Sequence, residues 1–262
     1  MKKNYHTHTV RCRHADGSER EYIEKAIEAG FDTLGFSDHS PYVFRDGYYS
    51  SFRMRPEELP DYVDTLTALR GEYRDRIDVK IGLEAEFYRD NWSDYLKLID
   101  HSGVEYLIMG QHYVNGEYPG APYSGKADDD VSRLDAYVAS VIDGARTGLY
   151  SYIAHPDMIR FTGDRGLFAK KLEMMVAEVQ REGLPFEINM LGLREGRHYP
   201  SELFLSILEK RKADVILGSD AHEPRWVFHR ETYERALALV DRYHLHLTEE
   251  FDTCRLKKHG LL

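Results

Sequence analysis

The sequence is short of cysteine, with only Cys12 and Cys254 among 262 residues. Two cysteines so far apart do not make the disulfide framework of a small secreted protein, and they suit a reducing compartment. The sequence also lacks an apolar run long enough to cross a membrane, and no apolar stretch follows the first lysines as it would in a secretion signal. These absences predict a cytoplasmic protein that does not enter membranes.

The sequence also has fewer basic than acidic residues. The chain has 35 lysines and arginines against 45 aspartates and glutamates, which gives a formal net charge of −10. Binding to long nucleic acid requires a basic surface, so this charge balance argues against it. An anionic small molecule remains compatible with it, because bound metal ions and a few arginines can reverse the charge locally.

What the sequence does contain is a regular alternation of short apolar strands and amphipathic helices. After a very short first strand, strands are expected at 33–37, 79–87, 106–112, 152–157, 185–189 and 215–219. Helices are expected between and after them, at 18–29, 56–73, 92–100, 130–147, 167–182, 201–211 and 231–243. Such alternation predicts a parallel sheet with helical crossovers. We expect one domain over residues 1–262, an α/β barrel of seven strands, with an open doubly wound sheet as the alternative.

Histidine is abundant, with 13 residues, and two of them follow the first strand as His6-Thr-His8. Positions i and i+2 of an extended chain point to the same side. The two imidazoles would therefore lie side by side and could bind the same metal ion. A His-x-His pair alone is weak evidence for a metal site, because an exposed polar strand would look the same.

Further candidate ligands fall at the ends of the later strands. Parallel barrels build their sites at the carboxyl ends of the strands, so these residues should converge on one rim. Glu84 lies inside an apolar strand, where a carboxylate is costly unless it is paired or binds a metal. With His6 and His8, the candidates are His14, His39, Glu84, His112, His155, Asp220 and His222.

Nine nitrogen and oxygen ligands are too many for one ion, since zinc takes about four. They suit two or three divalent ions, with Glu84 bridging, and the donor types favour Zn²⁺, Mn²⁺ or Fe²⁺. Cys12 lies close to His14 in the sequence, and we interpret it as a bystander.

Together these motifs resemble those of the PHP (polymerase and histidinol phosphatase) superfamily, over residues 6 to 222. Within it the chain looks most like the histidinol-phosphate phosphatase family. The supporting stretches are Cys12-Arg-His14, Ser-Asp-His-Ser-Pro at 37–41, Gly-Leu-Glu at 82–84 and Asn-Met-Leu-Gly-Leu-Arg at 189–194. The chain departs from the family pattern at Gln111 and Glu86, and both could alter the shape of the substrate site.

The resemblance implies a distorted (β/α)₇ barrel and a trinuclear metal centre. The ligands would divide into three sets: His6, His8, Glu84 and Asp220; the shared Glu84 with His112 and His155; and His14, His39 and His222.

The resemblance also implies a phosphoric monoester hydrolase that converts L-histidinol phosphate to L-histidinol and phosphate in histidine biosynthesis. A metal-bridging hydroxide, held by Glu84 and the ions, would attack phosphorus in line. Arg160, Arg194 and Arg197 follow the strands on the same rim and are expected to bind the substrate phosphate, and Asp16 is a candidate proton donor.

Two other functions remain open. One is hydrolysis of a different small phosphomonoester or nucleotide, and the other is a non-catalytic, metal-stabilised domain. The long aromatic loop at 41–55 is a candidate lid over the site, although a surface loop would have the same composition.

Overall fold

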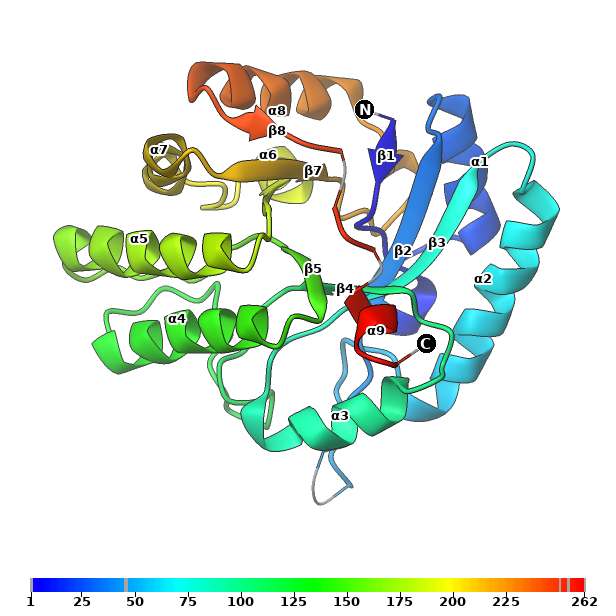
Figure 1. The fold of residues 1–262 in the computed structure, drawn as a ribbon, viewed down its shortest axis with the longest axis horizontal. Helices are drawn as coiled ribbons and strands as arrows, with labels where there is room; N and C mark the ends of the chain where they lie inside the picture. Colours follow the sequence, from blue (N-terminus) through cyan, green and yellow to red (C-terminus); the bar gives the residue numbers. More distant parts are fainter. Residues whose placement is uncertain (1, 45–46, 250, 254, 262) are drawn as a thin grey trace.

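The computed structural model is an α/β barrel in which eight parallel strands form one sheet in the order of the sequence (Figure 1). It describes residues 2–44, 47–249, 251–253 and 255–261, so Cys254 and residues 45–46 of the 41–55 loop lie outside the described residues. The strands are β1 (Lys3–Asn4), β2 (Thr33–His39), β3 (Asp78–Glu84), β4 (Tyr106–Met109), β5 (Tyr150–Ile153), β6 (Phe186–Asn189), β7 (Asp214–Gly218) and β8 (His246–Leu247).

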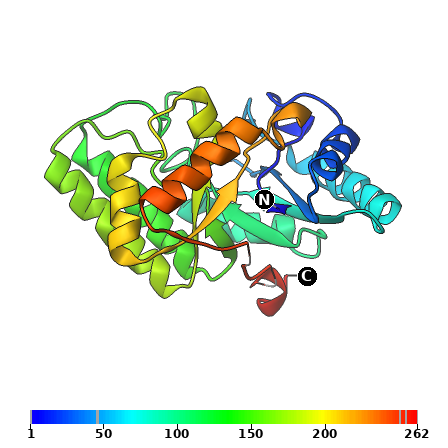
Figure 2. The same ribbon diagram turned by 90° about the horizontal axis from the view of Figure 1, so that it is seen from above.

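Helices cover the outside of this sheet, and Figure 2 shows the same arrangement from above. They are α1 (Glu19–Glu28), α2 (Leu59–Tyr73), α3 (Trp92–Ile99), α4 (Val131–Arg146), α5 (Arg165–Arg181), α6 (Met190–Glu195), α7 (Glu202–Arg211), α8 (Arg230–Arg242) and α9 (Arg255–Lys258). Short 3₁₀ turns include η1 (Val10–Cys12), η3 (Pro56–Glu58), η4 (Arg89–Asn91) and η5 (Pro224–Trp226). Every helix in the described ranges is too short or too polar to cross a membrane.

The predicted barrel is confirmed, with one strand more than the seven expected. The additional strand, β8, is two residues long and pairs with the start of β7, where Asp214 lies opposite His246. Two residues are too few to show a strand pattern in the sequence. Beyond β1, Thr7 pairs with Ala221, and the His8 amide donates to the Ala221 carbonyl at 2.9 Å. Among the described residues, the chain after the first strand therefore pairs with the chain after the seventh at the rim, which distorts the barrel.

Residues along each strand alternate between two cores. On β4, Leu107 and Met109 pack outward with the helices, whereas Tyr106 and Ile108 face into the barrel. The inner cluster is small and rich in tyrosine: Tyr5, Tyr106, Ile108, Tyr152, Ala154 and Ile216, with Phe251 packed against it.

Tyr106 fills the barrel at the end where the strands begin. Its hydroxyl lies 2.8 Å from the Tyr5 carbonyl oxygen and 3.1 Å from that of Phe36. A Cβ on Gly35 or Gly82 would lie 2.3 Å from Tyr106 atoms, so both positions require glycine. We call Tyr5, Tyr106, Tyr152 and Phe251 the tyrosine floor. Because this end is packed, the site must lie at the opposite end.

Candidate metal centre

A cavity of about 610 Å³ opens at the carboxyl ends of the strands. Six of the nine predicted ligands line it: His14, His39, His112, His155, Asp220 and His222. The other three, His6, His8 and Glu84, are buried against them. The structure therefore brings all nine residues together, as expected for the carboxyl ends of parallel strands.

Glu84, the last residue of β3, is the centre of this arrangement. Its side chain is 1% exposed, and five histidines from four strand ends surround it. The nitrogens that face its two oxygens are His155 Nε2 at 2.7 Å, His39 Nδ1 at 3.0 Å, His6 Nε2 and His112 Nε2 at 3.5 Å, and His8 Nε2 at 3.6 Å. A carboxylate in this position could bridge more than one ion.

Several groups of three side chains place their ligand atoms within 4.8 Å of one another. Four of them involve only the predicted ligands: His14, His39 and His222; His6, His8 and Glu84; His39, Glu84 and His112; and His6, His155 and Asp220. The first group is the predicted third set, and the second is most of the predicted first set. His39 and His155 also approach neighbouring sets, so the boundaries between the sets are less sharp than the resemblance implies.

Six buried atoms of these ligands have no hydrogen-bond partner among the described residues. They are His6 Nε2, His8 Nε2, His39 Nδ1, His155 Nδ1, His222 Nε2 and Glu84 Oε2. Buried polar atoms are nearly always paired, so this many unpaired atoms within one cluster need an explanation. Imidazole and carboxylate donors suit Zn²⁺, Mn²⁺ or Fe²⁺, and the residues present therefore fit bound divalent ions.

The pKa shifts of the buried histidines also indicate a site that favours bound cations. Burial lowers the pKa of His6, but Glu187, Asp220 and Glu84 outweigh it and raise the pKa to about 10. The carboxylates therefore attract positive charge, which protons or metal ions can supply. In the group formed by His14, His39 and His222, burial lowers the pKa of all three imidazoles. The pKa values of His39 and His222 lie well below the ordinary value. Neutral imidazole is the form that binds metals.

Three further carboxylates contact the Nδ1 atoms of three of these histidines and so orient the rings. Glu187 lies 2.7 Å from His6 Nδ1, Glu86 lies 2.9 Å from His112 Nδ1, and Asp38 lies 3.4 Å from His8 Nδ1. Such contacts would fix each ring so that its Nε2 is available to a metal ion. Sequence reasoning did not assign these roles. Glu187 interrupts an apolar strand as Glu84 does, and that signal could have identified it.

Two glycines make room for the central carboxylates. A Cβ on Gly110 would lie 1.8 Å from Glu84 Oε1, and one on Gly218 would lie 1.7 Å from Glu187 Oε1. Neither glycine has a left-handed backbone conformation, so glycine is required at both positions only because a side chain would not fit.

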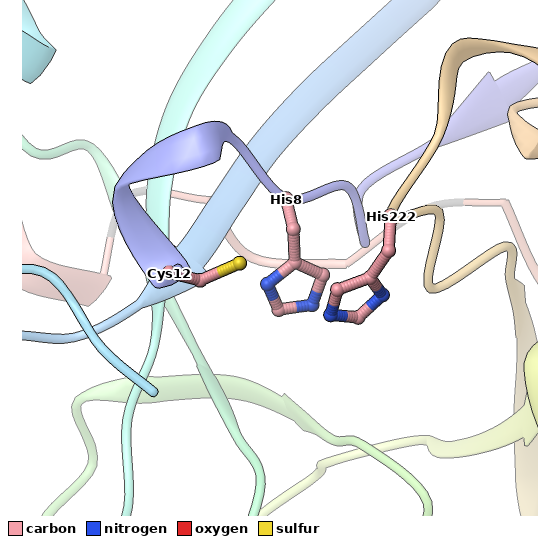
Figure 3. A group of neighbouring side chains, drawn as sticks. All are labelled: His8, Cys12 and His222. Atoms are coloured by element: carbon pink, nitrogen blue, oxygen red, sulfur yellow. The ribbon is translucent and has the colours of Figure 1, made fainter. Parts of the chain in front are cut away.

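Cys12 lies beside the cluster, as Figure 3 shows, with its sulfur facing the His8 ring and His222 on the other side of that ring. The ligand atoms of these three residues also lie within 4.8 Å of one another. Burial, with a further contribution from Asp38, raises the pKa of the Cys12 thiol. A protonated thiol is a poor ligand, which agrees with a bystander role.

Two of the three predicted phosphate-binding arginines line the cavity. Arg194 and Arg197 do so, whereas Arg160 is exposed and lies outside the cavity wall. The backbone of Arg160 is hydrogen bonded on both sides to the loop after β4, through Ser124 and Asp128. The role of Arg160 in binding phosphate therefore stays a prediction.

Arg194 is positioned by α6, a helix that the sequence pattern did not predict. The Asn189 side chain caps it by accepting a hydrogen bond from the Gly192 amide at 2.8 Å. The Arg194 guanidinium lies 4.4 Å from the centre of the Trp226 ring, and its nearest recorded carboxylate, Glu195, is 3.7 Å away. The Trp226 ring thus supports Arg194 without occupying its N–H groups.

The remaining wall of the cavity is aromatic and acidic. Asp16 lines it close to His14 and His222, and no hydrogen bond or ion pair of its side chain is found among the described residues. Residues that sequence reasoning did not place there include Phe52, Tyr123, Tyr199, Glu223 and Trp226. Phe52 belongs to the 41–55 loop, which therefore contributes to the cavity wall.

The fold and the site define an α/β barrel with a metal-binding cavity at the carboxyl ends of its strands. The chain belongs to the PHP family, since the model of the PHP domain matches residues 4–190. A Deinococcus radiodurans protein named "Probable histidinol-phosphatase" is 31% identical over 231 residues, which cover 84% of this chain and 85% of that protein. A Shewanella oneidensis protein named "Probable phosphatase" is 26% identical over 240 residues, covering 90% and 81%.

A solved structure shows the same fold. The histidinol phosphate phosphatase of Lactococcus lactis, complexed with zinc, L-histidinol and phosphate, superposes with a TM-score of 0.74 and 20% sequence identity over 97% of both chains. With these relatives, the chain is a phosphatase of the PHP family.

Proposed function

We propose that this protein hydrolyses L-histidinol phosphate to L-histidinol and inorganic phosphate, as a step of histidine biosynthesis, and that residues 1–262 act as one domain. The observation that carries the proposal is the gathering of nine potential metal ligands, with Glu84 among them, beside two cavity arginines. The names of the relatives from Deinococcus and Lactococcus support this choice of substrate.

Two or three divalent ions, Zn²⁺, Mn²⁺ or Fe²⁺, would be held by His6, His8, His14, His39, Glu84, His112, His155, Asp220 and His222. When bound, such ions neutralise phosphoryl oxygens and lower the pKa of bound water, so that hydroxide for an in-line attack is available near neutral pH. The protein's own contribution is to hold the ligands rigidly through Glu187, Glu86 and Asp38.

The cavity also suits a substrate that carries both charges. Arg194 and Arg197 offer guanidinium groups to the phosphate, although Arg197 is already paired with Glu195 at 2.7 Å. Glu223 and Asp16 offer carboxylates to an ammonium group, and the rings of the wall can stack on an imidazole. Asp16 could also return a proton to the leaving alcohol, because it lines the cavity beside the ligands.

A panel of phosphomonoesters tests the proposed substrate. With Mn²⁺ or Zn²⁺ at fixed concentration, we expect kcat/KM for L-histidinol phosphate to exceed that for glycerol phosphate and nucleoside monophosphates by about a hundredfold or more, or roughly 2.7 kcal/mol. Equal values across the panel would favour the second candidate, a phosphatase of another small phosphomonoester, which the Shewanella relative supports. Fewer than two ions per chain in protein never exposed to chelator would contradict the multinuclear site.

Replacing Arg194 with Ala tests the phosphate contact. We expect KM to rise by about tenfold or more while the metal content is unchanged, because a hydrogen bond between charged groups contributes about 1.5–3 kcal/mol. Arg225→Ala is a matched control, since Arg225 stacks on the same Trp226 ring at 4.7 Å but lies outside the cavity wall. Steady-state kinetics that show the same change in both variants would exclude a direct phosphate contact by Arg194.

A further inference from the structure

Arg53, in the 41–55 loop, is one of the largest fully buried side chains in the protein, with 2% of its surface exposed. A guanidinium group removed from water is strongly unfavourable unless its charge and its N–H groups are satisfied. Neither the sequence motifs nor the proposed function assigns any role to this residue.

All five N–H groups of Arg53 are accounted for. Glu86 accepts from both terminal nitrogens, at 3.1 and 2.8 Å, and Glu117 accepts from Nε and Nη2, at 2.9 and 2.7 Å. The remaining N–H donates to the Ser40 carbonyl oxygen at 2.7 Å. Two bidentate pairs on one guanidinium fix both its position and its plane.

These partners lie next to metal ligands. Glu86 Oε1 is also 2.9 Å from His112 Nδ1, and the other ring nitrogen of His112 faces Glu84 at 3.5 Å. Ser40 directly follows His39, and Glu117 lies in the loop that follows His112. Arg53 thus connects the loops after β2, β3 and β4 around the His39, Glu84 and His112 group.

The same side chain also supports the ring that covers these ligands. The guanidinium lies 4.6 Å from the centre of the Phe52 ring and 5.2 Å from that of Tyr42. The Phe52 ring is in turn 5.2 Å from the ring of His39 and 6.0 Å from that of His112.

We propose that Arg53 is a positioning residue of the metal centre, which fixes the Glu86 carboxylate that orients His112 and so sets the affinity for the ion bound there. The inference rests on the proposed metal centre. Lysine cannot replace arginine in this role, because one ammonium group cannot form two planar bidentate pairs.

Zn²⁺ affinities, measured ion by ion in competition with a fluorescent chelator, test the proposal on the full-length protein. In Arg53→Lys we expect one ion to bind about tenfold or more weakly and the others to stay within about threefold, as for other residues behind metal ligands. Glu86→Gln, which keeps the shape of the side chain, should weaken the same ion and provides the test if Arg53→Lys does not fold.

Arg70→Lys is the matched control. Arg70 pairs with Glu105 at 2.9 Å, a residue just before β4 and therefore at the end of the barrel away from the ligands. This variant should lower the melting temperature without changing any Zn²⁺ affinity.

The outcomes separate the two proposals. Wild-type affinities in both Arg53→Lys and Glu86→Gln, or an equal weakening of every ion, would overturn the positioning role. A wild-type protein that binds fewer than two Zn²⁺ ions would instead overturn the metal centre, and the positioning role with it.

Discussion

Glu84→Gln should reduce kcat/KM by about a thousandfold or more, which is the largest effect we expect from a single substitution. The amide has the shape of the carboxylate but lacks its charge, and five histidine nitrogens lie within 3.6 Å of that charge. Without it, bound ions would lose the one ligand that the His6–His8 and the His39–His112 groups share. Metal analysis should show that at least one ion is lost per chain, alongside the loss of phosphatase activity.

Glu105→Gln provides the control for this experiment. Glu105 is also partly buried and accepts hydrogen bonds, from Arg70 and from the Ile81 amide, but it lies at the other end of the barrel. Its replacement should affect stability and leave the metal content unchanged. A Glu84→Gln protein with full metal content and activity would show that Glu84 is not a ligand.

Gly110→Ala should inactivate the protein by adding only a methyl group. The new Cβ would lie 1.8 Å from Glu84 Oε1, so the carboxylate must leave its place among the histidines. We expect a loss of about a hundredfold or more in kcat/KM, because a small displacement of a positioned group has a cost of this order. Activity and the number of ions per chain should fall together.

Gly71→Ala is the matched substitution at a site with space. Gly71 lies within α2, and a Cβ there would meet no atom within 4 Å. Alanine in place of glycine inside a helix should raise stability by about 0.5–1 kcal/mol, with no effect on activity. Full activity in Gly110→Ala would show that the Glu84 side chain can move aside without loss of function, and would contradict this prediction.

The convergence of the candidate ligands could be predicted because parallel strands end on the same rim whatever their exact bounds. This is why His112 and His155 lie in the cluster although β4 and β5 each end several residues earlier than expected. The same reasoning gave the class of fold, and it missed β8, which is held by its pairing with β7 and has too few residues for a pattern.

The residues behind the ligands could not be predicted in this way. Arg53 lies in an irregular loop, and its partners Glu86 and Glu117 come from two other loops. Only the packed structure brings these three together. Glu86 departs from the family pattern and was expected to alter the shape of the substrate site, and the structure places it against His112. Gln111 likewise bonds to the backbone of Phe87 and Tyr113 and lies outside the cavity wall.

The position of Arg160 could not be predicted either. Its distance from His155 along the chain is compatible with the rim, but its backbone pairs with residues 124–128 and its side chain is exposed outside the cavity wall. Such pairing between loops leaves no periodic signal in the sequence, and the roles of Arg160 and Arg194 in binding phosphate stay predictions.

The tyrosine floor determines the route by which ligands enter and leave the site. Because Tyr106 and its neighbours pack the far end of the barrel, ions, substrate and products would all share the mouth formed by the strand ends. Ions held at the buried Glu84 would lie deepest, and a phosphoryl group held by Arg194 would lie between them and solvent. The ions would therefore have to bind before the substrate, and bound substrate would block their exit.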